Sequence, residues 1–361
     1  SVTGVQTCAL PIFNVANSDD RLRGQFCAQN LAHTAPSYNM LSDSVTQYLV
    51  FQGWVNILLL TGPLEEDVKL ADALKRSIRR NGARLVEERK FIASNDPRQR
   101  EQNNTRLLTG GSRDYDVVFI ADTDGEFART FPYQTVRARP VVGASGLQPE
   151  QWHWTWERQG APQLSSRFHN AFNRVMYGPD WSAWAAVRSL ALAQTKVKSI
   201  DYRAVREYFL SDQLRFDGYM GSPLDFRSWD HQLRMNVFLT LPNAVIARAP
   251  LDKFEHATND LDTLGVGAHL DRTADGPAHP LHGVSRGETR HAAPLGEQVR
   301  DQDHRPAHRR PPGRPHGLPG RAPARAFADP PRGLDGPACR RSRHPAPSSK
   351  SATRASPTTC R

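Results

Sequence analysis

The sequence lacks the signatures of the common classes of membrane and nucleotide-binding protein. In 361 residues it holds no uninterrupted apolar run of about 18, the length that a membrane-spanning helix needs. It also holds no Gly-x-Gly-x-x-Gly, no Walker loop and no Gly-x-Ser-x-Gly elbow around a nucleophilic serine. We therefore expect no direct membrane insertion, and the missing motifs lower the expectation of an enzyme.

Cysteine is scarce as well. Of the 4 cysteines, Cys8 lies at the unusual beginning of the chain, and Cys339 and Cys360 lie in its unusual C-terminal segment. The remaining one, Cys27, cannot define a disulfide framework. It is either a small buried hydrophobe or a half-cystine of a protein from an oxidising compartment, and the sequence leaves both interpretations open.

Basic residues are unevenly distributed. The formal net charge of +10 comes from 47 Lys and Arg against 37 Asp and Glu. Residues 267–361 hold 17 of the basic and 8 of the acidic residues, which leaves 30 and 29 for the rest of the chain. The body is therefore near neutral, and the sequence predicts no nucleic-acid-binding core.

The two ends of the chain differ from the body in composition. Residues 267–361 hold 15 of the 27 prolines but few large apolar side chains, too few to offset the entropy of ordering, so we expect a disordered tail. Its Arg, Pro, Ala, Gly and His without periodicity are typical of a GC-rich gene read out of frame; the alternative is a polybasic arm. Residues 1–12, SVTGVQTCALPI, resemble a translated sequencing adapter, and we exclude them from the fold.

Between these ends, patterns of strand and helix alternate. Continuous apolar runs such as WVNILLL (54–60) are typical of strands buried on both faces of a parallel sheet. The alternation predicts a doubly wound α/β layout with right-handed crossovers, followed by a more helical part. The predicted strands are 13–16, 54–60, 84–91, 116–121, 140–143, 215–218, 223–226, 234–241 and 244–249, and the predicted helices are 38–52, 65–81, 97–108, 126–131, 161–173, 180–194 and 202–210.

Ligands of such sheets bind at the carboxyl ends of the strands, which singles out residues 17–20, 61–63, 122–124 and 144–146. The strand that ends in Asp122-Thr123-Asp124-Gly125 is similar to the way haloacid-dehalogenase-like phosphatases present a nucleophile and an acid/base around Mg²⁺. The alternatives are the Asp-x-Asp metal site of some glycosyltransferases and a polar turn that caps the next helix. Because no later Gly-Asp-x-x-x-Asp run supplies further carboxylates, we predict no metal site.

Three tryptophans alternate in Trp152-His153-Trp154-Thr155-Trp156. In an extended segment this spacing would place the three indoles on one face. Such a face is an aromatic wall for a ligand, or else it belongs to the core or covers the hinge. No His or Cys lies at ligand spacing from His153, so the histidine does not indicate zinc.

Several segments together resemble type I periplasmic binding proteins, the extracytoplasmic solute receptors of ABC transporters. They are HTAPS (33–37) with the helix after it, residues 54–88, DYDVVFIADTDGEF (114–127), and residues 218–239 with Gly218, Gly221, Phe226 and Asp230 at the spacing of the family's late hairpin. Residues 139–168, 176–193 and 256–265 resemble a branch linked to pyrroloquinoline-quinone (PQQ)-dependent alcohol oxidation.

The resemblance implies a non-catalytic receptor without a cofactor, which binds a small molecule between two Rossmann-like lobes in the periplasm and works with an ABC transporter permease. It assigns residues 13–37 and 147–222 to the first lobe, which we expect to be truncated, and residues 38–146 and 223–262 to the second. The signal peptide is expected to belong to the missing N-terminal part. The resemblance implies ligand contacts at Asn17, Ser18, Asp19, Glu66, Asp122, Thr123 and Ser145. The end of the strand 54–60 adds Thr61 to these candidate ligand-binding residues.

Overall fold

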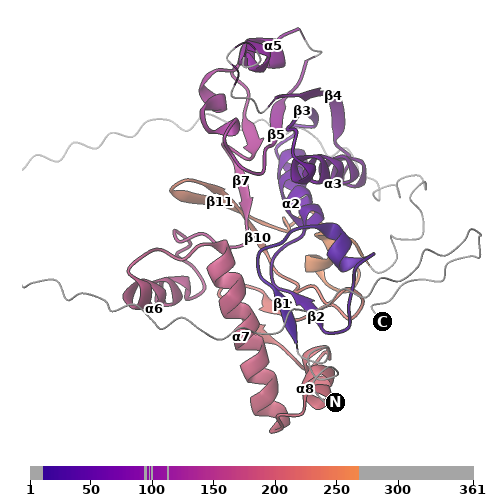
Figure 1. Ribbon diagram of the computed structural model, residues 1–361, viewed down its shortest axis with the longest axis vertical. Coiled ribbons are helices and arrows are strands. Elements are labelled where there is room, and N and C mark those ends of the chain that lie inside the picture. The colour runs from indigo at the N-terminus through magenta and orange to yellow at the C-terminus, as the bar shows by residue number, and fades with distance from the viewer. Residues whose placement is uncertain (1–10, 93–95, 97, 99–100, 112–113, 268–361) are drawn as a thin grey trace, which may run out of the picture. The chain divides into compact units, whose positions relative to one another are not determined.

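The computed structural model describes residues 11–92, 96, 98, 101–111 and 114–267 (Figure 1). The predictions for the leader and the tail therefore lie almost entirely outside the described residues, although Ile12, which we assigned to the leader, begins the first strand. Within the described part, no helix is both long enough and apolar enough to cross a membrane. The elements below belong to one compact unit of the chain.

Four parallel strands form the larger sheet. Their order is β4 (Arg84–Lys90), β3 (Asn56–Thr61), β5 (Val117–Ala121) and β6 (Val141–Gly143). Every residue of β5, and all of β3 except its first, is buried, as continuous apolar runs predict. Two helices, α2 (Tyr38–Phe51) and α3 (Glu65–Asn81), pack against each other and contribute Leu49 and Leu74 to the core on one face of the sheet.

The other face of this sheet is covered by shorter elements. The helix α5 (Thr105–Thr109) and the 3₁₀ helix η4 (Ala128–Tyr133) contribute Leu108 and Phe131 to a second core. We call the four-stranded sheet with its helices the sheet body. Because its crossovers are helical and its strands parallel, the predicted doubly wound layout is confirmed here.

A second set of elements forms what we call the helical body. It contains the parallel pair β1 (Ile12–Asn14) and β2 (Leu31–His33) and the antiparallel pair β8 (Phe216–Asp217) and β9 (Pro223–Leu224). Its helices are α6 (Ala161–Phe172), α7 (Gly178–Val197) and α8 (Tyr202–Phe209). Their shared core includes Trp152, Trp181 and Phe226.

A three-stranded antiparallel sheet joins the two bodies. It has the order β11 (Ala244–Ala249), β10 (Val237–Leu241) and β7 (Gln148–Glu150), with β7 and β10 side by side in Figure 1. Successive side chains of a strand point to opposite faces. Phe238 accordingly lies in the core of the helical body, and Leu239 lies in a core of the sheet body. The strand β10 therefore contributes side chains to both cores.

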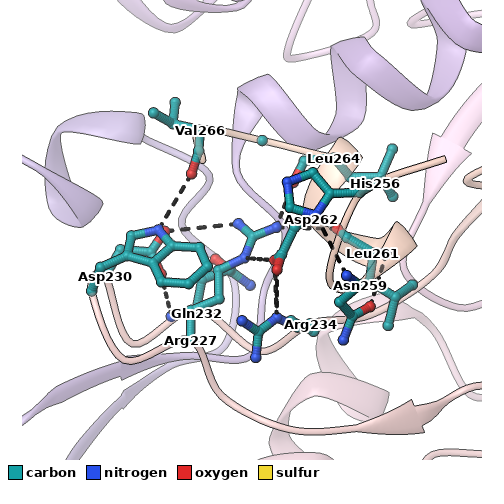
Figure 2. A network of polar contacts seen from close by, with 12 residues as sticks. Arg227, Asp230, Gln232, Arg234, His256, Asn259, Leu261, Asp262, Leu264 and Val266 are labelled. Atoms are coloured by element: carbon teal, nitrogen blue, oxygen red, sulfur yellow. Dashed lines mark hydrogen bonds and ion pairs between the residues drawn. The ribbon is translucent and has the colours of Figure 1, made fainter. Parts of the chain in front are cut away.

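The segment that follows the 3₁₀ helix η5 (Asp260–Thr263) is held by buried charge (Figure 2). Arg227, only 1% exposed, donates through Nε to Oδ1 of Asp262 at 2.7 Å and through Nη2 to the carbonyl oxygens of Leu261 and Leu264. Arg234 donates to the same carboxylate at 2.9 Å. These contacts hold Leu261, Asp262 and Leu264 against the side chains of Arg227 and Arg234, which lie between β9 and β10 in the chain.

The structure corrects two of the predicted helices. Residues 97–108 hold, in their described part, the 3₁₀ turn η3 (Glu101–Asn103) and the separate helix α5. They are separate because the side chain of Asn104 accepts from the Arg106 N–H and begins a new helix. The helix predicted at 126–131 is the 3₁₀ helix η4, which starts at Ala128 and contains Pro132.

The three tryptophans do not share one face, and the core-packing interpretation is confirmed for Trp152 and Trp156. The segment is not extended, because the Trp156 N–H donates to the His153 carbonyl at 3.0 Å and closes a turn. Trp152 is buried and stacks on Trp181 with ring centroids 6.2 Å apart, whereas Trp154 is 43% exposed. These tryptophans therefore form no continuous aromatic wall. Cys27, for which the sequence leaves two interpretations, is disulfide-bonded.

Candidate ligand-binding site

A cavity of about 750 Å³ lies at the carboxyl ends of β3, β4 and β5. Its wall is formed by Pro63 and Leu64 after β3, by residues that follow β4, by Asp122 and Asp124 after β5, and by residues of η4. This is the edge at which a parallel sheet leaves room for a ligand, because the polar loops diverge from it. Cavities of several hundred Å³ are typical of small-molecule sites.

Asp67 fixes the shape of this edge. Its fully buried carboxylate accepts from the Leu64 N–H at 3.1 Å and from the Thr123 N–H and hydroxyl at 2.7 and 2.6 Å. One side chain in the first turn of α3 thereby joins the loop after β3 to the loop after β5. Gly62 lies so close that a Cβ there would overlap Asp67 Oδ2 and the ring of Phe91.

Asp122 contributes a buried carboxyl group to the cavity wall. The residue is 4% exposed, and its Oδ2 accepts from the Ala128 N–H at 2.8 Å, which begins η4. Burial, together with the neighbouring carboxylates of Asp124 and Asp67, raises the pKa of Asp122 to about 6. Asp124 is exposed, and its Oδ1 accepts from the Glu126 N–H at 3.0 Å. The geometry is that of the polar turn that the sequence left as one alternative.

Aromatic side chains also line the cavity. Phe91 and Phe127 stack with ring centroids 3.9 Å apart, and Phe127 lies 5.3 Å from Phe131. Arg129 is the one cationic side chain among the cavity-lining residues that the structure describes. The lining therefore combines carboxylates with phenyl rings, and Phe91 lies beside Asp67, since a Cβ on Gly62 would meet both side chains.

The other predicted residues of the sheet body differ in position. Thr61 is 1% exposed, and its hydroxyl donates to Oε1 of Glu88 on β4 at 2.9 Å, so it stabilises the sheet edge. Glu66 is exposed and pairs with Lys69 at 2.8 Å. Ser145 follows β6 and is half-buried. These three side chains do not line the cavity described above.

The residues predicted after the first strand form a separate polar turn. Asn17 is exposed, and its side-chain oxygen accepts from the Asp19 N–H at 2.8 Å. The Ser18 carbonyl accepts from the Tyr38 N–H at 2.8 Å. Arg23 stabilises the turn by donating to the carbonyl oxygens of Asn17 and Asp19.

Asp19 connects this turn to the sheet body. Its carboxylate pairs with Arg21 at 2.7 Å and with Lys69 of α3 at 3.0 Å. The hydrogen bonds from Arg21 hold the pKa of Asp19 well below its usual range. Because Glu66 also pairs with Lys69, the structure brings Asp19 and Glu66 to one lysine. Asp122 and Thr123 lie instead at the edge of the cavity, where Asp122 lines the wall and Thr123 donates two hydrogen bonds to Asp67.

Sequence reasoning missed Asp67 and the phenylalanines of the cavity. The strand ends identified the two loops, but the bond between Asp67 and Thr123 spans 56 residues and leaves no mark in a local pattern. The one available signal was Asp67 as the third acidic residue in the first turn of α3, a position whose side chain can reach back to the loop before it.

Comparison with known proteins defines the fold. No protein-family model and no curated protein matches the sequence. Among solved structures, the chain is similar to an amino acid ABC transporter substrate-binding protein from Pseudomonas fluorescens Pf-5, with a TM-score of 0.57 and 11% identity over 73% of this chain and 76% of that one.

Two further solved structures are similar to this chain at comparable TM-scores. A branched chain amino acid ABC transporter periplasmic ligand-binding protein from Burkholderia xenovorans LB400 gives a TM-score of 0.55 at 14% identity, over 66% of this chain and 70% of that one. An ABC transporter solute binding protein from R. palustris in complex with benzoate gives a TM-score of 0.53 at 12% identity, over 68% of this chain and 71% of that one. The chain therefore has the α/β fold of the two-lobed periplasmic binding proteins, as predicted.

The phosphatase alternative receives no support from these comparisons. Within the described residues, no group of three or more His, Cys, Asp or Glu side chains is placed to hold a metal ion. Asp122 and Asp124 instead accept the backbone N–H groups of Ala128 and Glu126. The Asp-x-Asp spacing is thus accounted for by the turn between β5 and η4.

Proposed function

We propose that this chain is the solute-binding component of an ABC transporter, which captures a small molecule in the periplasm and delivers it to a permease. The finer proposal, from sequence resemblance, is a role beside PQQ-dependent alcohol oxidation. The fold supports the general proposal, since the similar structures are described as substrate-, ligand- or solute-binding proteins of ABC transporters. It is a transport function without catalysis.

The observation that carries the proposal is the cavity at the carboxyl ends of β3, β4 and β5. Asp122 is the predicted site residue that lines it, and Thr123 is bonded to its rim through Asp67. Ligand contacts at the remaining predicted residues stay a prediction; these residues are Asn17, Ser18, Asp19, Thr61, Glu66 and Ser145.

The mechanism that we propose is hinge closure. The lobes, which the sequence predicts as 13–37 with 147–222 and 38–146 with 223–262, would close around the solute, and binding would shift the population toward the closed form. The strand β10 offers the mechanical link, because Phe238 and Leu239 lie in different cores. The ion pair between Asp19 and Lys69 would be one contact that changes on closure.

A thermal-shift screen of the full chain tests the proposal. We expect at least one of a set of alcohols, aldehydes, quinone-cofactor precursors, amino acids and aromatic acids to raise the unfolding midpoint saturably, because a ligand that binds only the folded state stabilises it. Hydrolysis of p-nitrophenyl phosphate with Mg²⁺, measured in parallel, should be absent. Phosphatase activity that Asp122→Asn abolishes would contradict a receptor.

A further inference from the structure

Three ion pairs join the polar turn of residues 17–23 to the helix α3. In each pair one charge belongs to the turn and the other to the helix, so all three connect the helical body to the sheet body. The pairs and their N···O distances are Asp19 with Lys69 at 3.0 Å, Arg21 with Glu65 at 3.2 Å, and Asp20 with Arg76 at 3.1 Å.

The polar turn is fixed to the helical body. Arg23 donates through Nη1 to the carbonyl oxygens of Asn17 and Asp19, and through Nη2 to that of Ala35 at 2.7 Å. Its Nε donates at 3.0 Å to the side-chain oxygen of Gln232, a buried residue that forms a β-bridge to β2. A movement of the helical body would therefore carry the turn with it and separate the turn from α3.

The helix α3 presents its half of the three pairs on one face. Glu65, Lys69 and Arg76 are four and seven residues apart, spacings that bring side chains to the same side of a helix. Lys69 also lies 2.9 Å from Glu65 and 2.8 Å from Glu66, so its ammonium group is already oriented by its own helix. The core residues Leu74 and Ile78 hold α3 on the sheet. These charges therefore belong to the sheet body and would stay with it.

The central pair, Asp19 with Lys69, is partly shielded from water, with side chains that are 13% and 19% exposed. Hydrogen bonds from Arg21 hold the pKa of Asp19 below its usual range, and hydrogen bonds to Glu66 and Glu65 raise the pKa of Lys69. Both groups therefore stay charged near neutral pH. Ionic strength is the variable that weakens such pairs, because the screening length falls from about 30 Å in 10 mM salt to about 3 Å in 1 M salt.

We propose that these three ion pairs form a latch, which holds the turn against α3 in the absence of a solute and opens as the ionic strength rises. The inference rests on the proposed hinge closure and adds a device that regulates it. A solute then stabilises an arrangement that the chain already populates at low salt. Its apparent affinity should fall at high salt, because a smaller fraction of the chain is in the arrangement that binds.

The distance between the two bodies tests the latch without any solute. The exposed residues Arg79 of α3 and Arg188 of α7 are replaced in the full chain by p-acetylphenylalanine, which takes nitroxide labels without reaction at cysteine. Pulsed electron paramagnetic resonance then reports the distance between the labels. We expect one main distance in about 10 mM NaCl and a several-fold larger share of a second distance in about 1 M NaCl.

Lys69→Met should give the second distance already at low salt, because it removes the central cation. The matched control is Lys75→Met, which removes a lysine of the same helix whose ion pairs, with Asp72 and Glu88, stay within the sheet body. It should keep the distances of the unmodified sequence at both salt concentrations. Arg21→Met, which removes one cation of the turn, should shift the distances in the same direction as Lys69→Met, but less.

Two outcomes would overturn the latch. One is a distance distribution that does not change with salt; the other is a Lys69→Met distribution equal to that of Lys75→Met, even if Lys69→Met unfolds at a lower temperature. In either case the pairs are static contacts, and the receptor function stays open to the thermal-shift screen. A screen in which no solute binds, together with distances that change with salt, would remove the receptor function and leave the latch.

Discussion

Replacing Asp67 by Asn should destabilise the protein because of three hydrogen bonds. The carboxylate accepts from the Leu64 N–H through Oδ2 and from the N–H and hydroxyl of Thr123 through Oδ1. The amide of Asn has one oxygen, so whichever way it turns, its NH₂ group faces a donor. A hydrogen bond to a charged group contributes about 1.5–3 kcal/mol, and an unpaired buried donor costs about as much. Allowing for the easier burial of a neutral side chain, we expect a loss of about 2–3 kcal/mol.

Urea unfolding followed by circular dichroism measures this loss. For a domain of this size, a loss of about 2–3 kcal/mol corresponds to a fall in the thermal unfolding midpoint of about 4–12 °C. The matched control is Asp72→Asn in the same helix, where the carboxylate is exposed and, among the described residues, pairs with Lys75 alone; we expect a change below about 0.5 kcal/mol. If Asp67→Asn and the control were indistinguishable, the claim that Asp67 holds the two loops of the cavity together would be refuted.

Three further predictions concern the supporting structure. Burial raises the pKa of Glu150 to about 7, so the folded protein is more stable while this carboxyl group is protonated, and that stability is lost as the pH rises from about 4.5 through 7. We expect the free energy of unfolding, measured by urea titration, to fall by about 1–3 kcal/mol between pH 5 and pH 8 because of this group. Glu150→Gln should remove that pH dependence. Arg227→Met leaves the buried carboxylate of Asp262 short of a partner and should cost about 3 kcal/mol or more by urea unfolding (Figure 2). Gly62→Ala places a Cβ against Asp67 and should lower stability by about 1–3 kcal/mol in the same assay.

Each of these has an outcome that contradicts its reasoning. An unchanged slope of stability against pH in Glu150→Gln would mean that the carboxyl group is solvated in the folded protein. Full stability in Arg227→Met would mean that water or Arg234 compensates for the lost contacts. A stable Gly62→Ala would show that the loop after β3 can move away from α3.

Regular elements were predictable from the sequence because their causes are local. The helix α3 was predicted at its observed bounds, since acidic residues at its start, basic residues near its end and Gly82 after it all mark the limits of a helix. β3 and β5 followed from their continuous apolar runs. The strand order β4-β3-β5-β6 places the predicted strand ends at one edge, and Asp122 was predicted there.

Other features depend on contacts that local patterns do not encode. The tryptophan segment turns because of a hydrogen bond to the His153 carbonyl, which competes with the extended form that period two suggests. The short strands β2 and β7 were missed, because Leu31–His33 and Gln148–Glu150 have only three residues each. Thr61 stays a predicted ligand contact, and the bond from its hydroxyl to Glu88 on β4, 27 residues further along the chain, is one that no local pattern indicates.

The central claim is that a solute binds at the carboxyl edge of the four-stranded sheet. Hydrogen–deuterium exchange of the full chain, with and without the solute that gives the largest thermal shift, tests it most directly. The account predicts slower exchange at the amides of residues 62–67 and 122–134, which form the cavity rim, with little change in α6. Protection confined to the helical body, with the rim unchanged, would contradict it.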